Sequence, residues 1–119
     1  MRRRALILGI SGQTGSYLAE WLLEQDYQVY GMLRRTSTQN LWRLTAFQQR
    51  LELVEGDLLD ESSLRRLLTM IRPDEVYNFA AQSHVGTSFV EPTYTSEVTG
   101  LGVLRLFEAA RNGIPSSRI

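Results

Sequence analysis

The stretch that decides the fold is Ala5-Leu-Ile-Leu-Gly-Ile-Ser-Gly-Gln-Thr-Gly15. Its apolar start has the length of a buried strand, and glycines follow at positions 9, 12 and 15. A helical pattern begins immediately afterwards, and four large side chains are predicted to share its buried face. These side chains are Tyr17, Leu18, Trp21 and Leu22. The sequence therefore predicts a strand, a glycine turn and a helix in direct succession.

A strand–glycine–helix unit of this kind is suited to binding phosphate. Gly9 permits the tight turn, Gly12 lets the backbone approach a pyrophosphate, and Gly15 lets the helix pack closely on the strand. The helix N-terminus offers free N–H groups and the positive end of its dipole. The spacing is G-x-x-G-x-x-G and not the commoner G-x-G-x-x-G of dinucleotide sites. A turn between strand and helix that binds no ligand is the alternative.

Length and composition limit the class of protein. A chain of 119 residues forms one domain at most. With 13 basic and 13 acidic residues the formal net charge is zero, so neither a nucleic acid nor an anionic membrane is expected as a partner. The chain has no cysteine and no apolar run near the ~20 residues of a membrane span. We read Arg2–Arg4 and the apolar run after them as part of a first strand, not a signal peptide, and expect a cytoplasmic protein.

The rest of the chain alternates strands with helices. Strands are predicted over 28–33, 51–54 and 75–81, and helices over 40–49, 61–71 and 94–111, with Asp60 as the N-cap of the second. This alternation predicts an α/β fold, a Rossmann-like doubly wound parallel sheet that is truncated after about four βα units. Ligands of such sheets bind beyond the carboxyl ends of the strands, at the switch point beside the first strand.

Two arginines, Arg34 and Arg35, close the second predicted strand. NAD-specific sites usually have an acidic residue there, which holds the ribose 2′-hydroxyl. Arginine cannot accept that hydrogen bond, but its planar guanidinium suits a 2′-phosphate, and Thr36 and Ser37 add hydroxyl donors. The pattern predicts a preference for NADP over NAD. A solvated loop whose charges serve no ligand is the alternative.

The ends of the third and fourth predicted strands are further candidates. Asp57 can accept from an adenine amino group while Leu58 packs on the ring, although a turn or cap aspartate explains the residue type equally well. Small residues within Phe79–Ser83 allow the backbone to approach a ribose or diphosphate, with plain close packing as the alternative. The lone His84 is more typical of a hydrogen-bonded loop than of a catalytic base. Without a second histidine or a cysteine, no metal site is expected.

Several of these segments resemble the extended short-chain dehydrogenase/reductases and, among them, the GDP-mannose 4,6-dehydratases. The matching segments are 9–20, 34–37, 56–58, 77–85 with its Ala-Gln-Ser-His-Val, 88–89 and 94–95. The sequence departs from the dehydratases at Thr14, where they usually have aspartate. It also departs in a shorter 40–51 segment and in the less acidic run 96–99.

This resemblance implies an NADP site, an activity and an assembly. The residues implied to contact NADP are Gly9, Ile10, Ser11, Gly12, Gln13, Thr14, Gly15, Arg34, Arg35, Thr36, Ser37, Asp57, Leu58, Phe79, Ala80, Ala81, Gln82, Ser83 and Tyr94. The implied activity is that of a lyase, acting as a homodimer or homotetramer, that converts GDP-mannose to GDP-4-keto-6-deoxymannose. In this family a hydride leaves C4 of the hexose, water is lost across C5 and C6, and the hydride returns at C6, so NADP is not consumed.

The catalytic groups of the family are absent from these 119 residues. The family uses a Tyr-x-x-x-Lys pair and a glutamate, and this chain contains no lysine. We therefore expect residues 1–119 to be an incomplete NADP-binding Rossmann domain, the N-terminal part of a longer enzyme, with no catalytic residue. An unpaired sheet edge and uncovered apolar helix faces predict that the piece alone is poorly soluble or loosely folded. An NADP-dependent epimerase or reductase of the same superfamily, or a non-catalytic NADP-binding module, are the alternatives.

Overall fold

The computed structural model describes residues 2–33, 41–79 and 102–113 of the chain. Strands and helices alternate through these ranges, as the sequence predicts. In chain order the elements are β1 (Arg4–Leu8), α1 (Gln13–Glu24), β2 (Gln28–Leu33), the 3-10 helices η1 (Trp42–Leu44) and η2 (Gln48–Arg50), β3 (Glu52–Glu55), α2 (Glu61–Ile71), β4 (Glu75–Asn78) and α5 (Gly102–Gly113).

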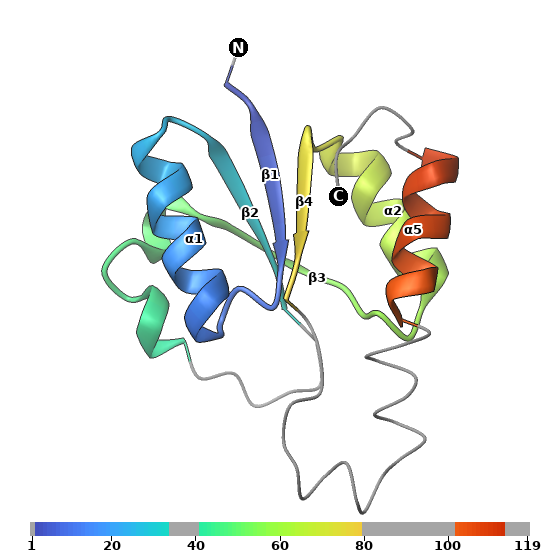
Figure 1. Ribbon diagram of the computed structural model, residues 1–119, viewed down its shortest axis with the longest axis horizontal. Coiled ribbons are helices and arrows are strands. Elements are labelled where there is room, and N and C mark those ends of the chain that lie inside the picture. The colour runs from blue at the N-terminus through green and yellow to red at the C-terminus, as the bar shows by residue number, and fades with distance from the viewer. Residues whose placement is uncertain (1, 34–40, 80–101, 114–119) are drawn as a thin grey trace, which may run out of the picture.

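The strands form one parallel sheet in the order β3-β2-β1-β4 (Figure 1). Ala5 lies opposite Val29 of β2, and Leu6 lies opposite Val76 of β4. The chain thus builds outward from β1 through β2 to β3, then crosses β1 to place β4 on its other side. The carboxyl ends of β1 and β4 flank the point where the winding reverses. This topology confirms the predicted Rossmann-like sheet and its switch point beside the first strand.

Helices cover both faces of the sheet. Ala5 and Ile7 of β1 belong to the core cluster beneath α1, whereas Leu6 and Leu8 belong to the cluster beneath α2 and α5. Figure 1 shows α1 on one side of the strands and the pair α2 and α5 on the other. The alternation follows from the two-residue period of a strand, which sends successive side chains to opposite faces. All of the apolar residues of β1 are therefore buried, which explains the unbroken apolar run at 5–8.

The buried face of α1 differs from the prediction. Tyr17 and Trp21 are 65% and 54% exposed, so the prediction that they face the core is wrong. The buried residues of this helix are Gly15, Ser16, Ala19, Leu22 and Leu23. Small residues lie where the helix approaches β1 and its turn, so close backbone approach fixes the rotation of α1. The largest side chains of its first two turns consequently face outward.

The segment after residue 40 is not the predicted single amphipathic helix. It forms the two 3-10 helices η1 and η2. The amide of Leu44 donates to the carbonyl oxygen of Leu41 at 2.9 Å in the first, and that of Arg50 donates to Phe47 at 2.9 Å in the second. Between them, the amide of Phe47 donates to the carbonyl oxygen of Leu44 at 3.0 Å. Leu44 and Phe47 are buried, while Gln48 is exposed. Positions 41, 44 and 47 are three residues apart, and a 3-10 helix, with three residues per turn, places such positions on one side. An α-helix, with 3.6 residues per turn, aligns them less well.

The helix α2 agrees closely with its prediction. An oxygen of Asp60 accepts from the amide of Ser63 at 3.2 Å, which caps the helix N-terminus. The buried residues of the helix are Leu64, Leu67, Leu68 and Ile71, at the spacing of one amphipathic face. The helix ends at Ile71, and its C-cap Arg72, with a left-handed φ of 51°, is followed by Pro73. The predicted strand 75–81 is observed as β4 over Glu75–Asn78, and residues 80–81 lie outside the described ranges, as do residues 94–101 of the last predicted helix.

A strand edge without a partner and exposed apolar side chains both occur in the described part of the chain. Within the described ranges, β4 pairs only with β1 and so has a free edge. Leu104 and Phe107 of α5 are 57% and 51% exposed. In these same ranges no helix is long and apolar enough to cross a membrane.

Candidate functional site

The turn between β1 and α1 is shaped by two of its glycines. Gly9 has a φ of 81°, a left-handed conformation that favours glycine, and its carbonyl oxygen accepts from the amide of Gly12 at 3.2 Å. A Cβ at position 15 would collide with that carbonyl oxygen and lie 3.0 Å from the Cα of Ile10. Both neighbouring atoms belong to the backbone and cannot swing aside. Gly15 therefore allows α1 to begin directly against the end of β1.

The N-terminus of α1 presents free hydrogen-bond donors beside this turn. Gly12 is the N-cap and supplies no side chain, and the first helical turn holds no acidic residue. The first bond of the helix runs from the amide of Ser16 to the carbonyl oxygen of Gly12 at 3.0 Å, so the amides of residues 13–15 precede it. No side chain in the described ranges accepts from these three amides. With the dipole of the helix behind them, they fit a phosphate or pyrophosphate group.

Of the predicted site residues that the structure describes, those of the glycine turn and Phe79 lie together at the end of β1. Ile10 is fully buried, backbone included, so its predicted contact with a ligand stays a prediction, whereas Gln13 and Thr14 are exposed. The amide of Phe79 donates to the carbonyl oxygen of Leu8 at 2.8 Å, which places the end of β4 beside the turn. The predicted contacts Arg34–Ser37, Ala80–Ser83 and Tyr94 lie outside the described residues, as does His84.

Asp57 and Leu58, which follow β3, both have structural roles in this fold. Asp57 Oδ1 accepts from the amide of Leu59 at 2.9 Å, which closes a local turn. Leu58 is only 3% exposed and packs in the core cluster with Met32 and Leu64. Their contact with an adenine ring stays a prediction.

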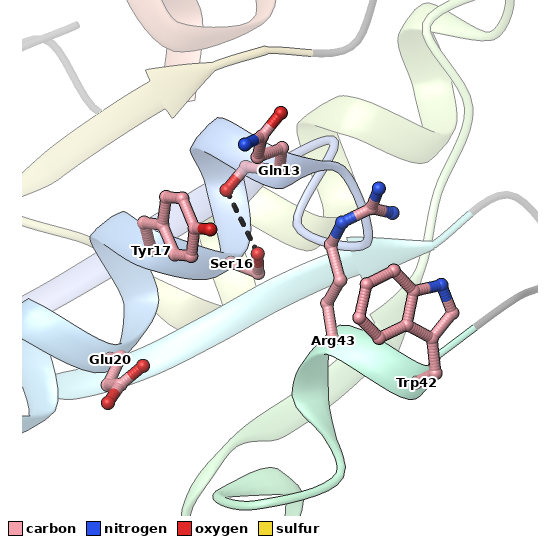
Figure 2. Close-up of a pocket in the computed structure, with 6 residues that line it drawn as sticks. All are labelled: Gln13, Ser16, Tyr17, Glu20, Trp42 and Arg43. Atoms are coloured by element: carbon pink, nitrogen blue, oxygen red, sulfur yellow. Dashed lines mark hydrogen bonds between the residues drawn. The ribbon is translucent and has the colours of Figure 1, made fainter.

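A pocket of about 220 Å³ adjoins the glycine turn on the outer side of α1 (Figure 2). Its walls come from α1 and η1, and its lining residues are Gln13, Ser16, Tyr17, Glu20, Trp42 and Arg43. The Arg43 guanidinium lies 4.5 Å from the centre of the Trp42 ring, and its Nη1 approaches the carbonyl oxygen of Ser11 at 3.5 Å. Sequence reasoning missed Arg43, although a Trp-Arg pair closely following two arginines was a usable signal.

A second pocket, of about 310 Å³, lies at the opposite end of the sheet, where the strands begin. Two of its arginines are already engaged. Arg2 donates to the carbonyl oxygen of Tyr27 at 2.8 Å, and Arg4 donates to that of Ile71 at 2.9 Å. Because two of its three arginines bind backbone carbonyls and it lies away from the carboxyl ends of the strands, this larger pocket is not the candidate site.

One tyrosine in the sheet has a strongly shifted pKa. Burial, together with the hydrogen bond that its hydroxyl donates to Glu75 at 2.8 Å, raises the pKa of Tyr77 to about 12. Tyr27 donates to the other oxygen of Glu75 at 3.2 Å. The three side chains tie β4 to the segment before β2, so Tyr77 is a neutral structural hydroxyl and not a base. No cluster of three metal-ligating side chains occurs in the part of the chain that the structure describes.

Comparison with known proteins points to one group of enzymes. The family model for GDP-mannose 4,6 dehydratase matches residues 6–119. GDP-mannose 4,6 dehydratase 1 of Arabidopsis thaliana is 51% identical over 93% of this chain and 33% of its own length. GDP-mannose 4,6-dehydratase of Yersinia enterocolitica is 51% identical over 94% of this chain and 32% of its own. The chain thus spans about a third of the length of the curated relatives it matches.

Solved structures resemble the chain as well. The crystal structure of the Thermus thermophilus UDP-glucose 4-epimerase complex with NAD has a TM-score of 0.78 and 30% sequence identity to it. The similarity covers 92% of this chain and 34% of the epimerase.

Proposed function

The chain belongs to the GDP-mannose 4,6-dehydratase family, and on that premise we propose that it is the coenzyme-binding N-terminal part of a longer, cytoplasmic enzyme. The proposed enzyme converts GDP-mannose to GDP-4-keto-6-deoxymannose and acts as a homodimer or homotetramer. The match over residues 6–119 and the 51% identity to curated dehydratases support this activity over that of an epimerase. The solved epimerase is less similar, at 30% identity.

The observation that carries the proposal is the uncapped N-terminus of α1 against the glycine turn. Its three amides, which have no partner among the described residues, and the left-handed Gly9 suit the pyrophosphate of a dinucleotide. NADP, when bound, supplies a hydride acceptor that also returns the hydride. The residues of this chain bind and orient that coenzyme, and the groups that move protons on the hexose lie elsewhere in the enzyme.

The choice of NADP over NAD rests on Arg34 and Arg35, which follow β2 directly in the sequence. Guanidinium groups at this place suit a 2′-phosphate, while the carboxylate that would hold a 2′-hydroxyl is absent from the end of the strand. The two hydroxyl residues Thr36 and Ser37 extend the same proposed contact.

The test is to incubate the full-length protein with GDP-mannose and NADP and to follow the sugar nucleotide by mass spectrometry and NMR. We expect a product that has lost one water and carries a 4-ketone, with no net formation of NADPH. A product of unchanged mass with an inverted hexose centre would contradict the proposal and identify an epimerase. Binding of NADP without any turnover would identify a non-catalytic module.

A further inference from the structure

Arg43 is a cation that is held in position beside the glycine turn. Its guanidinium stacks on Trp42 at 4.5 Å, and one of its N–H groups points to the carbonyl oxygen of Ser11 at 3.5 Å. Figure 2 shows the side chain extending from η1 toward that turn, with the Trp42 ring alongside. Arg43 is half-buried, so neighbouring atoms restrict the conformation of its side chain.

The charge of Arg43 has no anionic partner in the described ranges. Arg2, Arg3, Arg65 and Arg111 each pair there with a carboxylate within 4.0 Å. Among the residues that the structure describes, Arg43 contacts a carbonyl oxygen and an aromatic face, and Glu20 in the same pocket forms no such ion pair with it. Stacking occupies one face of the guanidinium plane and leaves N–H groups at its edge free for an oxyanion.

The position of η1 indicates which anion the guanidinium of Arg43 binds. Leu44, the neighbour of Arg43, is buried in the cluster that includes Leu33, the last residue of β2. Arg43 therefore approaches the glycine turn from η1, which packs into the same core cluster as the carboxyl end of β2. In sheets of this topology that is where the adenosine ribose lies, and where NAD sites hold its 2′-hydroxyl. The pyrophosphate is assigned to the amides at the N-terminus of α1, so it does not require Arg43.

We propose that Arg43 binds the 2′-phosphate of the coenzyme's adenosine ribose and is a specificity-determining residue in addition to Arg34 and Arg35. This inference rests on the proposed function, because it assumes that the turn binds a dinucleotide. Trp42 is then a positioning residue, whose ring holds the guanidinium in its bound orientation before the coenzyme arrives.

The experiment is a calorimetric titration of the full-length protein and its Arg43→Gln variant with NADP and with NAD. Losing one charge-assisted hydrogen bond to phosphate predicts that the variant binds NADP about tenfold more weakly, while its affinity for NAD changes by less than about twofold. Arg43→Lys, which keeps the charge but not the planar fork, is expected to lie between wild type and Arg43→Gln.

Arg50→Gln is the matched control. It removes the same charge from the neighbouring turn η2, where Arg50 donates to the carbonyl oxygen of Leu23 at the far end of α1, and it is expected to leave both affinities unchanged. Equal weakening of NADP and NAD by Arg43→Gln, or no weakening of either, would overturn the assignment. A wild-type protein that binds neither coenzyme would refute the proposed function itself, so the two failures are distinguishable.

Discussion

Replacing Gly12 and Gly15 separately by alanine tests whether the glycine turn serves the ligand, the fold or both. Gly12 has φ −79° and ψ 174°, which alanine adopts without strain, and an added Cβ would lie 3.5 Å from the carbonyl oxygen of Gly9, an ordinary contact. The loss of a glycine N-cap and the reduced entropy of the unfolded chain act in opposite directions. The folded state should therefore change in stability by less than about 1 kcal/mol.

Gly12→Ala should nevertheless impair coenzyme binding. The new methyl group occupies the approach to the amides of residues 13–15, so the pyrophosphate cannot come within hydrogen-bond distance without displacement. We expect the dissociation constant for NADP to rise at least about tenfold, which is ~1.4 kcal/mol. Calorimetric titration of the full-length enzyme measures this rise.

Gly15→Ala should act first on the fold. Its Cβ meets backbone atoms of Gly9 and Ile10, so α1 must move away from β1 and loosen the packing of Ala19 and Leu22. Overpacking against rigid neighbours costs about 1–3 kcal/mol, and the thermal midpoint should fall clearly below that of Gly12→Ala. Normal coenzyme affinity in Gly12→Ala, or equal thermal midpoints for the two variants, would refute this assignment of roles.

The remaining predictions concern stability and solubility. Asp60→Ala removes the cap of α2 and should destabilise the fold by about 1 kcal/mol in chemical denaturation, whereas Asp60→Asn, which can still cap, should not; equal losses would contradict the capping role. Between pH 10 and about 12 only the unfolded chain loses the Tyr77 proton, so this residue makes stability fall as the pH rises, and Tyr77→Phe should flatten that part of the urea-denaturation profile. An unchanged alkaline slope would show that the raised pKa has no effect on folding. Residues 1–119 alone should aggregate through their exposed apolar surface, and replacing Leu104 and Phe107 by glutamate should raise the soluble fraction; a soluble, cooperatively unfolding wild-type piece would count against this.

The sequence predicted most accurately those parts of the fold whose signals are local. The apolar run before Gly9 indicated β1, and Asp60 with the leucines after it defined α2 almost to the residue. Both depend on chain periodicity and on capping, which act within a few residues. The parallel sheet with its switch point beside the first strand then followed from the alternation of strands and helices and from the handedness of crossovers.

Features that depend on tertiary distance were predicted less well. The size of Tyr17 and Trp21 suggested a buried face, but the close approach of Gly15 to Gly9 sets the rotation of α1. Residues 40–49 were predicted as an α-helix with 3.6 residues per turn, but the chain there follows a three-residue period. The contact of Arg43 with the glycine turn was therefore not predicted. In both cases a contact between segments, which no local pattern encodes, decided the outcome.

The most direct test of the central claim is an experimental structure of the full-length protein with NADP bound. We predict that oxygens of the pyrophosphate lie about 3 Å from the amides at the N-terminus of α1, and that the 2′-phosphate lies between the carboxyl end of β2 and Arg43. A coenzyme bound elsewhere, or a turn whose amides are covered by side chains of the protein itself, would contradict the account.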